Sequence, residues 1–412
     1  MSIIVRRPWL EEFLRMSGRR LLYGRRKTGK TFYARYVLPH YQYFIVRKGG
    51  IIYDPIEDQE LDTRTFIRIC RIQDNIIVDE FHRAEPRLFD AIQAGVCSGN
   101  IVFITSTMHY YKRFMEGSEA PLKGLFSIRH VGLLSPLELL SHEWSMEGKQ
   151  LIEHLVFYQE PTLIGRSLKD IVFSGKEFAR SLVGEILDEE DQVHTRRYDA
   201  ILEAVAAGKN RLTEIASYLY ARRLIPKPST SHITKYVDIL LKTGLLERIE
   251  VWGKKRKSYY RHVSPLIEIE YYLNAKYGFF DLPLTWSYIE KILDHYMPIL
   301  VERFMERFLA ELLGLKPVKI LEPEIDITLV EFKKVKLVAE VKWKNKLSRR
   351  EVKEVEDKLL RFEEARKILI VPDQTIVPET TLEVWDIRTL QEEVKRHSTI
   401  GHFESIQSSS MR

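Results

Sequence analysis

The sequence contains few cysteines, no long apolar run and no internal repeat of fixed period. Only two cysteines, Cys70 and Cys97, occur in 412 residues, and each lies in an apolar stretch. A disulfide framework and a cysteine-based zinc cluster are therefore excluded, and a reducing cytoplasm is the expected location. No apolar run approaches the roughly 20 residues that a membrane helix needs, and the N-terminus lacks the apolar core of a signal peptide. We therefore expect no membrane partner.

The composition is that of a folded and highly charged protein. Hydrophobic residues make up 45% and charged residues 30% of the chain, which excludes the disordered classes. A length of 412 residues predicts two or three domains. The net charge of +6 favours anionic partners. The oligomeric state is left open by these data.

Residues 21–31, LLYGRRKTGKT, fit the pattern G-x-x-x-x-G-K-[ST] after a short apolar run. Glycines let a loop curl around a triphosphate, and a helix N-terminus adds its dipole. Lys30 is expected to reach the β- and γ-phosphates of ATP, and the Thr31 hydroxyl to bind Mg²⁺. The alternative is that Gly24 and Gly29 are turn residues and Lys30 a solvated side chain. The expected nucleotide contacts are Gly24, Arg25, Arg26, Lys27, Thr28, Gly29, Lys30, Thr31 and Phe32.

A second motif, NIIVDEFHR at residues 75–83, indicates a buried strand that ends in two acids. The carboxyl ends of parallel strands are where α/β sheets place their sites. Asp79 is expected to hold Mg²⁺ through water, and Glu80 to orient or deprotonate the attacking water. The alternative is that both acids lie at the strand end because it meets solvent.

Alternating strands and helices over residues 1–135 predict an α/β fold with a doubly wound parallel sheet. Residues 101–105 indicate a third buried strand, and residues 127–134 a fourth. In ATPases with this pair of acids, a polar residue after the third strand senses the γ-phosphate. Thr105 and Ser106 are the candidates, and capping of a following helix is their alternative role.

The segments LLYGRRKTGKT, IIVDEF, VFITSTM and APLKGLFSIRHVGLLSPLEL, taken in order, resemble the archaeal ATPase family of the AAA+ and STAND superclass over about residues 1–270. The resemblance implies an ATPase that uses Mg²⁺. Members typically carry a Gly-Arg pair after the Pro-Leu element, and here that pair is Gly124-Leu125. Arg113 and Arg129 are the alternative candidates for an arginine finger.

Two further units follow the ATPase core. Residues 136–190 have helical periodicity throughout and predict a lid hinged near Ser135-Pro136. Residues 191–270 resemble a winged helix, with three helices followed by a hairpin whose tip carries four cations. Such folds bind DNA through the third helix and the wing, although in related ATPases they also dock proteins. The expected DNA contacts are Ser231, His232, Lys235, Lys254, Lys255, Arg256 and Lys257.

Residues 271–396 form the last predicted domain, and residues 397–412 a loose tail. Alternation places Glu340 and Lys342 on one face of a strand, 14 residues after Asp326 (340 minus 326). The order of these segments resembles the PD-(D/E)xK nucleases, in the form of a DUF234-type tail. The resemblance implies that Asp326 and Glu340 hold Mg²⁺, that Lys342 activates water, and that Glu306 completes the metal shell, with Glu302 as the less favoured substitute.

Two functional hypotheses follow. The first is a cytoplasmic ATP-driven protein that binds DNA and has a nuclease-like tail. The second is a STAND-type regulatory switch that docks proteins and whose tail is catalytically inert. Salt dependence of DNA binding distinguishes the two. The DNA sequence recognised and the biological pathway are left open.

Overall fold

The computed structural model describes residues 3–106, 122, 124–173, 175–189, 195–254 and 257–397. The N-terminal part forms a seven-stranded sheet in the order β4-β3-β2-β5-β6-β1-β7. Strands β2, β5, β6, β1 and β7 are parallel, and β3 and β4 extend the sheet as an antiparallel edge. The strands are β1 (Arg19–Tyr23), β2 (Gln42–Val46), β3 (Ile52–Asp54), β4 (Gln59–Leu61), β5 (Ile76–Asp79), β6 (Ile101–Thr105) and β7 (Ser127–His130).

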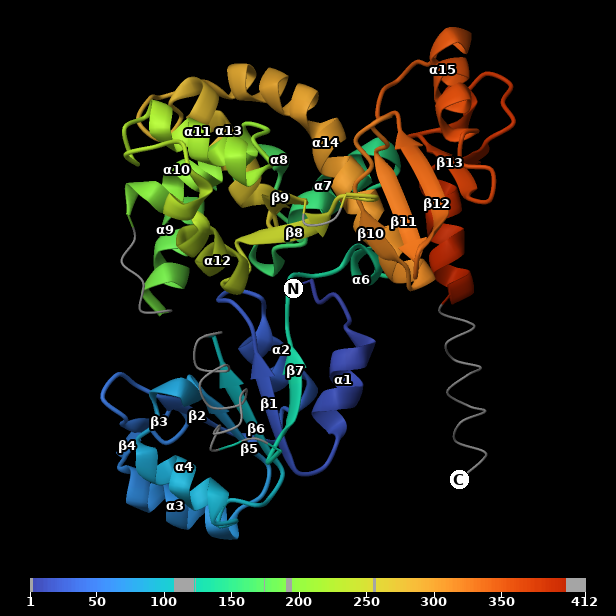
Figure 1. The fold of residues 1–412 in the computed structure, drawn as a ribbon. Coiled ribbons are helices and arrows are strands. Elements are labelled where there is room, and N and C mark those ends of the chain that lie inside the picture. The colour runs from blue at the N-terminus through green and yellow to red at the C-terminus, as the bar shows by residue number, and fades with distance from the viewer. Residues whose placement is uncertain are drawn as a thin grey trace.

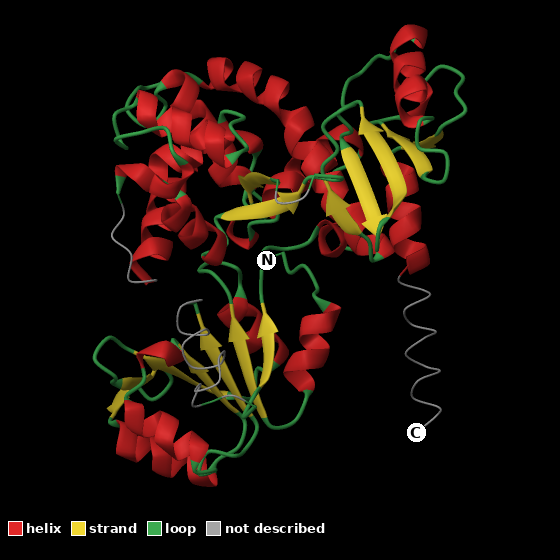
Figure 2. Ribbon diagram, in the orientation of Figure 1, coloured by secondary structure: helices red, strands yellow, loops and turns green. Residues whose placement is uncertain are grey.

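Helices cover both faces of this sheet (Figures 1 and 2). Neighbouring residues of β1 point to opposite faces: Leu22 packs in a core with α1 and α2, whereas Leu21 packs in a core with α3 and α4. The predicted doubly wound sheet is thus confirmed. Its helices are α1 (Pro8–Arg15), α2 (Lys30–Val37), α3 (Thr63–Ile72), the short helix η1 (Phe81–Arg83) and α4 (Pro86–Gln93).

The two cysteines lie next to each other on one face of the sheet. Cys70 is in α3, Cys97 follows α4, and a disulfide joins them across a Cα–Cα distance of 5.2 Å. This disulfide was not predicted from the sequence. Sequence alone did not show that the ends of α3 and α4 meet, because the two residues occupy separate apolar stretches.

The helical segment predicted to be a lid, called here the lid, follows β7, and its first helix has a strong start signal. The Ser135 hydroxyl accepts a hydrogen bond from the Glu138 backbone N–H, the Glu138 carboxylate accepts one from the Ser135 N–H, and Pro136 occupies the first helical position. The lid elements are α6 (Pro136–Leu140), α7 (Gly148–Tyr158), η2 (Pro161–Leu163), α8 (Leu168–Phe173) and α9 (Gly175–Glu189).

Residues 195–263 form three helices and a two-stranded antiparallel hairpin, called here the helix–hairpin unit. The third helix of this unit is broken at its start, because the short helix η3 precedes α12. The elements are α10 (Arg196–Ala206), α11 (Leu212–Ala221), η3 (Thr230–His232), α12 (Thr234–Lys242), β8 (Leu246–Glu250) and β9 (Ser258–His262).

The C-terminal part is a five-stranded mixed sheet, β10-β11-β12-β13-β14, called here the C-terminal sheet. The first three strands run antiparallel, and β13 and β14 run parallel to β12. Its elements, with the two helices before it, are α13 (Pro265–Tyr277), α14 (Trp286–Leu313), β10 (Lys316–Val318), β11 (Ile327–Glu331), β12 (Lys334–Val341), α15 (Arg349–Leu359), β13 (Arg366–Ile370), η4 (Gln374–Ile376) and β14 (Glu383–Trp385).

The lid and the C-terminal sheet share one hydrophobic core. Leu155 of α7, Phe308 of α14 and Ala339 of β12 are fully buried in it. Helix α13 contributes to this core and to that of the helix–hairpin unit, so the expected boundary after residue 270 falls inside a helix. Within the described ranges, no helix is both long and apolar enough to cross a membrane.

Candidate functional site

The loop after β1 has the backbone shape that a phosphate site needs. Gly24 has φ 147°, and a Cβ there would lie 2.3 Å from the carbonyl oxygen of Val131. Gly29 has φ 84° and immediately precedes α2, whose first residue is Lys30. The loop therefore curls tightly and leads into a helix N-terminus, where backbone N–H groups and the helix dipole favour an anion.

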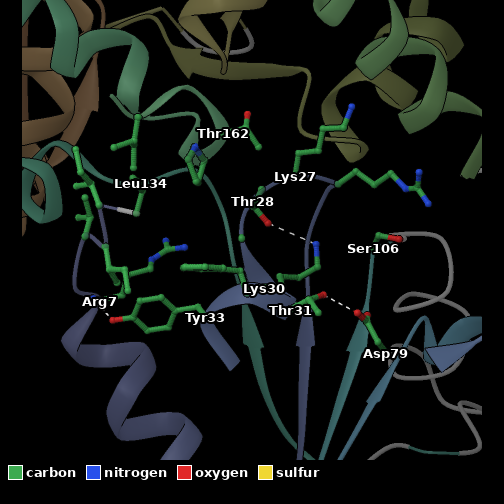
Figure 3. Close-up of a pocket in the computed structure, with 18 of the residues that line it drawn as sticks. Arg7, Lys27, Thr28, Lys30, Thr31, Tyr33, Asp79, Ser106, Leu134 and Thr162 are labelled. Atoms are coloured by element: carbon green, nitrogen blue, oxygen red, sulfur yellow. Dashed lines mark hydrogen bonds between the residues drawn. The ribbon is translucent and has the colours of Figure 1, made fainter. Parts of the chain in front are cut away.

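Lys30 lies inside this loop. Its side chain is buried, and Nζ donates hydrogen bonds to the carbonyl oxygens of Gly24 and Arg25, at 2.8 and 2.7 Å. A weaker bond of 3.4 Å reaches Thr28 Oγ1 (Figure 3). The ammonium group is thus held next to the space that a phosphate would occupy.

Thr31, the second residue of α2, and Asp79, the last residue of β5, come together from segments far apart in the sequence. Strand β6 lies between β1 and β5, so the carboxyl ends of all three meet at one edge. Thr31 Oγ1 donates a hydrogen bond of 2.6 Å to Asp79 Oδ2 (Figure 3), and the Tyr43 hydroxyl donates one of 2.9 Å to the same oxygen. Burial raises the pKa of Asp79 above its ordinary value. These paired oxygens, in a buried site, fit a hydrated Mg²⁺.

Glu80 follows Asp79 in a left-handed conformation, with φ 54°. Its carboxylate lies 3.9 Å from an Arg26 nitrogen and 3.4 Å from an Arg83 nitrogen. Ser106 Oγ donates a hydrogen bond of 3.3 Å to Glu80 Oε2. Cations and a hydroxyl thus orient this acid at the carboxyl end of β5.

The two sensor candidates occupy different positions. Ser106 contacts Glu80 and lines the cavity described below, whereas the fully buried Thr105 pairs through Oγ1 with His82 Nδ1 at 3.1 Å. Burial, with the Arg83 charge, lowers the pKa of His82 to about 4. His82 is therefore neutral near pH 7. The geometry favours Ser106 as the residue next to the γ-phosphate position.

A cavity of about 780 Å³ opens beside these groups (Figure 3). One side is polar and includes Lys30, Thr31 and Glu80. The other side is mostly apolar and comes from the N-terminal segment, the hinge and η2 with its neighbours. That side consists of Ile3, Ile4, Val5, Leu134, Pro161, Thr162, Ile164 and Gly165. A polar and an apolar end in one cavity suit a nucleotide, whose base and phosphates differ in the same way.

Of the predicted nucleotide contacts, residues 26–32 line the cavity, whereas Gly24 and Arg25 do not. The Arg25 guanidinium is buried and pairs with the fully buried Glu160 of the lid. The interpretation of the Arg25 side chain as a nucleotide contact is therefore wrong for this structure. Its partner lies 135 residues away in the sequence, and local sequence gave no signal of the pairing.

Other lid acids also pair with cations of the nucleotide domain. Glu185 of α9 lies 3.4 Å from Arg26 and 3.3 Å from Lys27. Glu138 of α6 accepts a hydrogen bond of 2.9 Å from Arg7, which lines the cavity. The lid glutamates, His82 and Tyr43 were missed by sequence reasoning, because only the fold brings their segments to the motif residues.

A second polar cluster lies on the C-terminal sheet. Lys342 Nζ donates a hydrogen bond of 2.9 Å to Glu340 Oε2 and lies 3.9 Å from Asp326 Oδ2. The Asp326 backbone N–H donates to Glu340 Oε1 at 3.2 Å. The three predicted residues thus converge. Lys358 of α15, which was not predicted individually, lies 2.5 Å from Glu340 Oε1.

The charges in this cluster are strongly coupled. Burial, with repulsion from Glu340, raises the pKa of Asp326. Burial alone would also raise the pKa of Glu340, but Lys342 and Lys358 outweigh it and hold that pKa below its ordinary value. Within the described residues, no group of three or more His, Cys, Asp or Glu side chains is gathered for a metal ion. The two acidic side chains with a neighbouring lysine still provide the oxygen donors that Mg²⁺ prefers.

The helix glutamate beside this cluster is Glu302 rather than Glu306. Glu306 is buried and pairs with Arg261 of β9 at 2.5 Å. Glu302 shares Lys319 with Asp326: Lys319 Nζ lies 3.1 Å from Glu302 Oε1 and 3.5 Å from the Asp326 carbonyl oxygen. The assignment of Glu306 to the metal shell is therefore corrected, because Arg261 already compensates the charge of the Glu306 carboxylate, one helical turn from Glu302.

The predicted DNA contacts lie in two places. Ser231, His232 and Lys235 are exposed around η3 and the start of α12. Lys254 lies 3.7 Å from Glu322, in the loop after β10, and Lys257 is exposed. Lys255, Arg256 and the arginine-finger candidate Arg113 lie outside the described residues. The other finger candidate, Arg129, is on β7 with its guanidinium 5.8 Å from the Phe13 ring.

Comparison with known proteins gives structural likeness only. No protein-family model and no curated protein matches the sequence. The Walker-type ATPase of Pyrococcus abyssi is 17% identical and covers 65% of this chain and 96% of its own, with a TM-score of 0.44. The ORC2 protein of Aeropyrum pernix, in ADPNP–ADP complexes, is 12% identical and covers 72% and 91%, with a TM-score of 0.38.

A signal-transduction ATPase with numerous domains from Pyrococcus horikoshii, which carries a tetratricopeptide repeat sensor, is 16% identical. It covers 75% of this chain and 48% of its own, with a TM-score of 0.31. The chain is thus similar to Walker-type and STAND ATPases. All three TM-scores are below 0.5.

Proposed function

We propose that this chain binds and hydrolyses ATP with Mg²⁺, in the manner of AAA+ and STAND ATPases. The observation that carries the proposal is the 2.6 Å hydrogen bond between Thr31 and Asp79, at the mouth of a cavity lined by the phosphate loop. A threonine at the start of a helix and an acid at the end of a parallel strand are the pair that Mg²⁺–nucleotide sites require. A cytoplasmic location, inferred from composition, stays a prediction, and the Cys70–Cys97 disulfide does not support it.

Each side chain has a definite task in this reaction. The loop N–H groups and Lys30 bind the phosphates, and Thr31 with Asp79 would hold Mg²⁺, which supplies positive charge to the phosphate oxygens. Glu80 orients the attacking water and accepts its proton, and Ser106 positions the Glu80 carboxylate. Arg26 contributes a further cation near Glu80.

Two substitutions separate nucleotide binding from hydrolysis. Lys30→Ala removes the buried ammonium and is expected to abolish ATP binding, whereas Glu80→Gln is expected to bind ATP and lose turnover by at least about a hundredfold. Lys48→Ala and Glu85→Gln, at exposed positions, are the matched controls. Isothermal titration with ATP and phosphate release measure the two effects. Normal turnover by Glu80→Gln would remove its assigned role.

A second candidate function is DNA cleavage at the C-terminal cluster, in a domain related to PD-(D/E)xK nucleases. It is favoured by the convergence of Asp326, just before β11, with Glu340 and Lys342, at the end of the neighbouring strand β12. The two acids would hold Mg²⁺ against the phosphate, and Lys342 would orient water and stabilise the developing charge. Glu302 replaces Glu306 as the helix acid in this proposal.

Nicking of supercoiled plasmid in Mg²⁺, with EDTA as a blank, tests this assignment. Asp326→Ala and Lys342→Ala are expected to lose the activity, and Asp357→Asn on the exposed face of α15 to retain it. Undiminished nicking by both alanine variants would place the activity elsewhere. Absence of nicking in the unmodified chain would favour the inert-tail alternative.

We further propose that the helix–hairpin unit is a winged helix that binds DNA. Exposed hydroxyl and cationic groups around η3 and α12 support this, because they are the donors that contact phosphates and base edges. The alternative is a protein-docking switch, favoured by the contact between Lys254 and Glu322 at the wing. DNA affinity measured over a range of salt concentrations distinguishes the two, since phosphate contacts release counterions.

A further inference from the structure

The wing of the helix–hairpin unit is already occupied by the C-terminal sheet. The Lys319 backbone N–H donates to the Glu250 carbonyl oxygen at 2.9 Å, and the Trp252 N–H donates to the Lys319 carbonyl oxygen at 2.9 Å. Lys316, at the start of β10, lies 2.9 Å from the Glu250 carboxylate. The hairpin thus extends along the C-terminal sheet, and this arrangement restricts access to the wing from that side.

A second set of exposed cations comes from the start of α10, the end of α11 with the loop after it, and the start of α12. Residues 215–237 contain no Asp or Glu. Four cations within this range are exposed and form no ion pair with any described residue. The same holds for Arg196 at the start of α10. We call this set the cationic face: Arg196, Arg222, Arg223, Lys227 and Lys235. Figure 1 shows α11 on the side of the unit away from the C-terminal sheet.

Several of these groups are held in place. The Arg222 guanidinium lies 3.4 Å from the centre of the Tyr218 ring, and Arg223 turns the chain with φ 58°. Next to them, Arg197 donates hydrogen bonds to the Leu224 carbonyl oxygen at 3.0 Å and to the Tyr236 hydroxyl at 2.6 Å. Ordered arginines lose little conformational entropy when they bind a phosphate.

We propose that the cationic face, and not the wing tip, is the phosphate-binding surface for duplex DNA. The inference rests on the proposed DNA binding and specifies where it occurs. The face borders η3, where the hydroxyls of Ser229 and Ser231 are exposed and 3.0 Å apart. Cations beside a row of small hydroxyl donors, at the start of the third helix, are the groups that bind DNA backbone in helix-turn-helix proteins.

The experiment is fluorescence anisotropy of a labelled 30-base-pair duplex with the full chain over a salt series. Substitution of Arg222, Arg223 and Lys227 together by Gln is expected to reduce the slope of log K against log salt by about 2.7, since each lost phosphate contact removes about 0.9. A matched control replaces three exposed lysines elsewhere, Lys169, Lys276 and Lys291, and is expected to leave the slope unchanged.

The outcomes separate the surface from the function. An unchanged slope in the cationic-face variant, or a larger decrease after Lys254→Gln with Lys257→Gln, would overturn the inference while DNA binding stands. Failure of the unmodified chain to bind DNA would overturn both. Competition by poly-glutamate at the same charge concentration as DNA, with equal effect, would assign the face to an acidic protein instead. Thermal melting and ATPase activity confirm that the variants are folded.

Discussion

The ion pair between Arg25 and Glu160 allows a quantitative test of how the lid is attached to the phosphate loop. Arg25 is 6% exposed and Glu160 is 0% exposed. One nitrogen of Arg25 and one oxygen of Glu160 already lack a hydrogen-bond partner in the described structure. Removing either partner therefore leaves an uncompensated charge in a site that water does not reach.

Arg25→Met alone and Glu160→Met alone are each expected to destabilise the chain by about 3–5 kcal/mol, the usual result of breaking a buried pair. The double variant places two apolar side chains of similar length together, and its cost is expected to stay below about 2 kcal/mol. The difference between the double variant and the sum of the single variants is the coupling energy, of several kcal/mol.

The assay is urea unfolding followed by tryptophan fluorescence, with the free energy taken from the first transition because a chain of several domains need not unfold in one step. ADP affinity is measured in parallel. Pro161 and Thr162, which follow Glu160 directly, line the cavity, so the single variants are also expected to weaken ADP binding. Single costs below about 1 kcal/mol that simply add would show that the pair is solvated and would refute the reasoning.

Three further predictions concern other sites. Gly24→Ala places a Cβ 2.3 Å from a backbone carbonyl oxygen, so ADP binding, measured by titration calorimetry, is expected to be lost. The control Gly132→Ala, whose Cβ would meet only a side chain at 3.7 Å, is expected to retain ADP binding. Burial and the Asp326 charge raise the pKa of Glu302 to about 7. The unfolding free energy should therefore fall as pH rises from about 4.5 to about 7, and Glu302→Gln should remove this dependence on pH. Glu185→Gln releases two phosphate-loop cations and is expected to tighten ADP binding about two- to fivefold. The effect is small because partly exposed ion pairs are weak. Glu177→Gln on the same helix is expected to leave ADP affinity unchanged.

The nucleotide site was predictable from sequence because its chemistry is encoded locally. Gly24, Gly29 and Lys30 must have fixed spacing for a loop to enclose phosphates, and an acid that ends an apolar run marks the carboxyl end of a strand. Burial of Ile76, Ile77 and the rest of β5 follows from the same apolar run. The parallel sheet then brings the two motifs together without further information.

The partners of these residues were not predictable in the same way. Glu160 and Glu185 reach the phosphate loop from lid segments more than 130 residues later, and nothing in their own neighbourhoods distinguishes them from solvated acids. The choice between Glu302 and Glu306 failed for a related reason. Residues four apart share a helix face, so periodicity cannot decide which one meets Lys319 and which one meets Arg261.

The attachment of the wing has a consequence for how the chain moves. The lid, α14 and the C-terminal sheet share one core, and Arg307 of α14 joins the Gln159 side chain of the lid to Glu247 of β8. These parts are therefore expected to move as one body. The contacts of that body with the nucleotide domain include the pairs of Arg7 with Glu138 and of Arg25 with Glu160.

In these pairs, and in those of Glu185, the nucleotide domain supplies the cations and the lid supplies the acids. Arg7, Arg26 and Lys27 also line the cavity. A triphosphate that enters the cavity brings negative charge to the same cations, so it competes with the lid acids for them. Nucleotide binding and lid attachment are then antagonistic at Arg7, Arg26 and Lys27, and not at the Arg25–Glu160 pair, because Arg25 does not line the cavity. The sign of this coupling follows from which side of the interface carries the carboxylates.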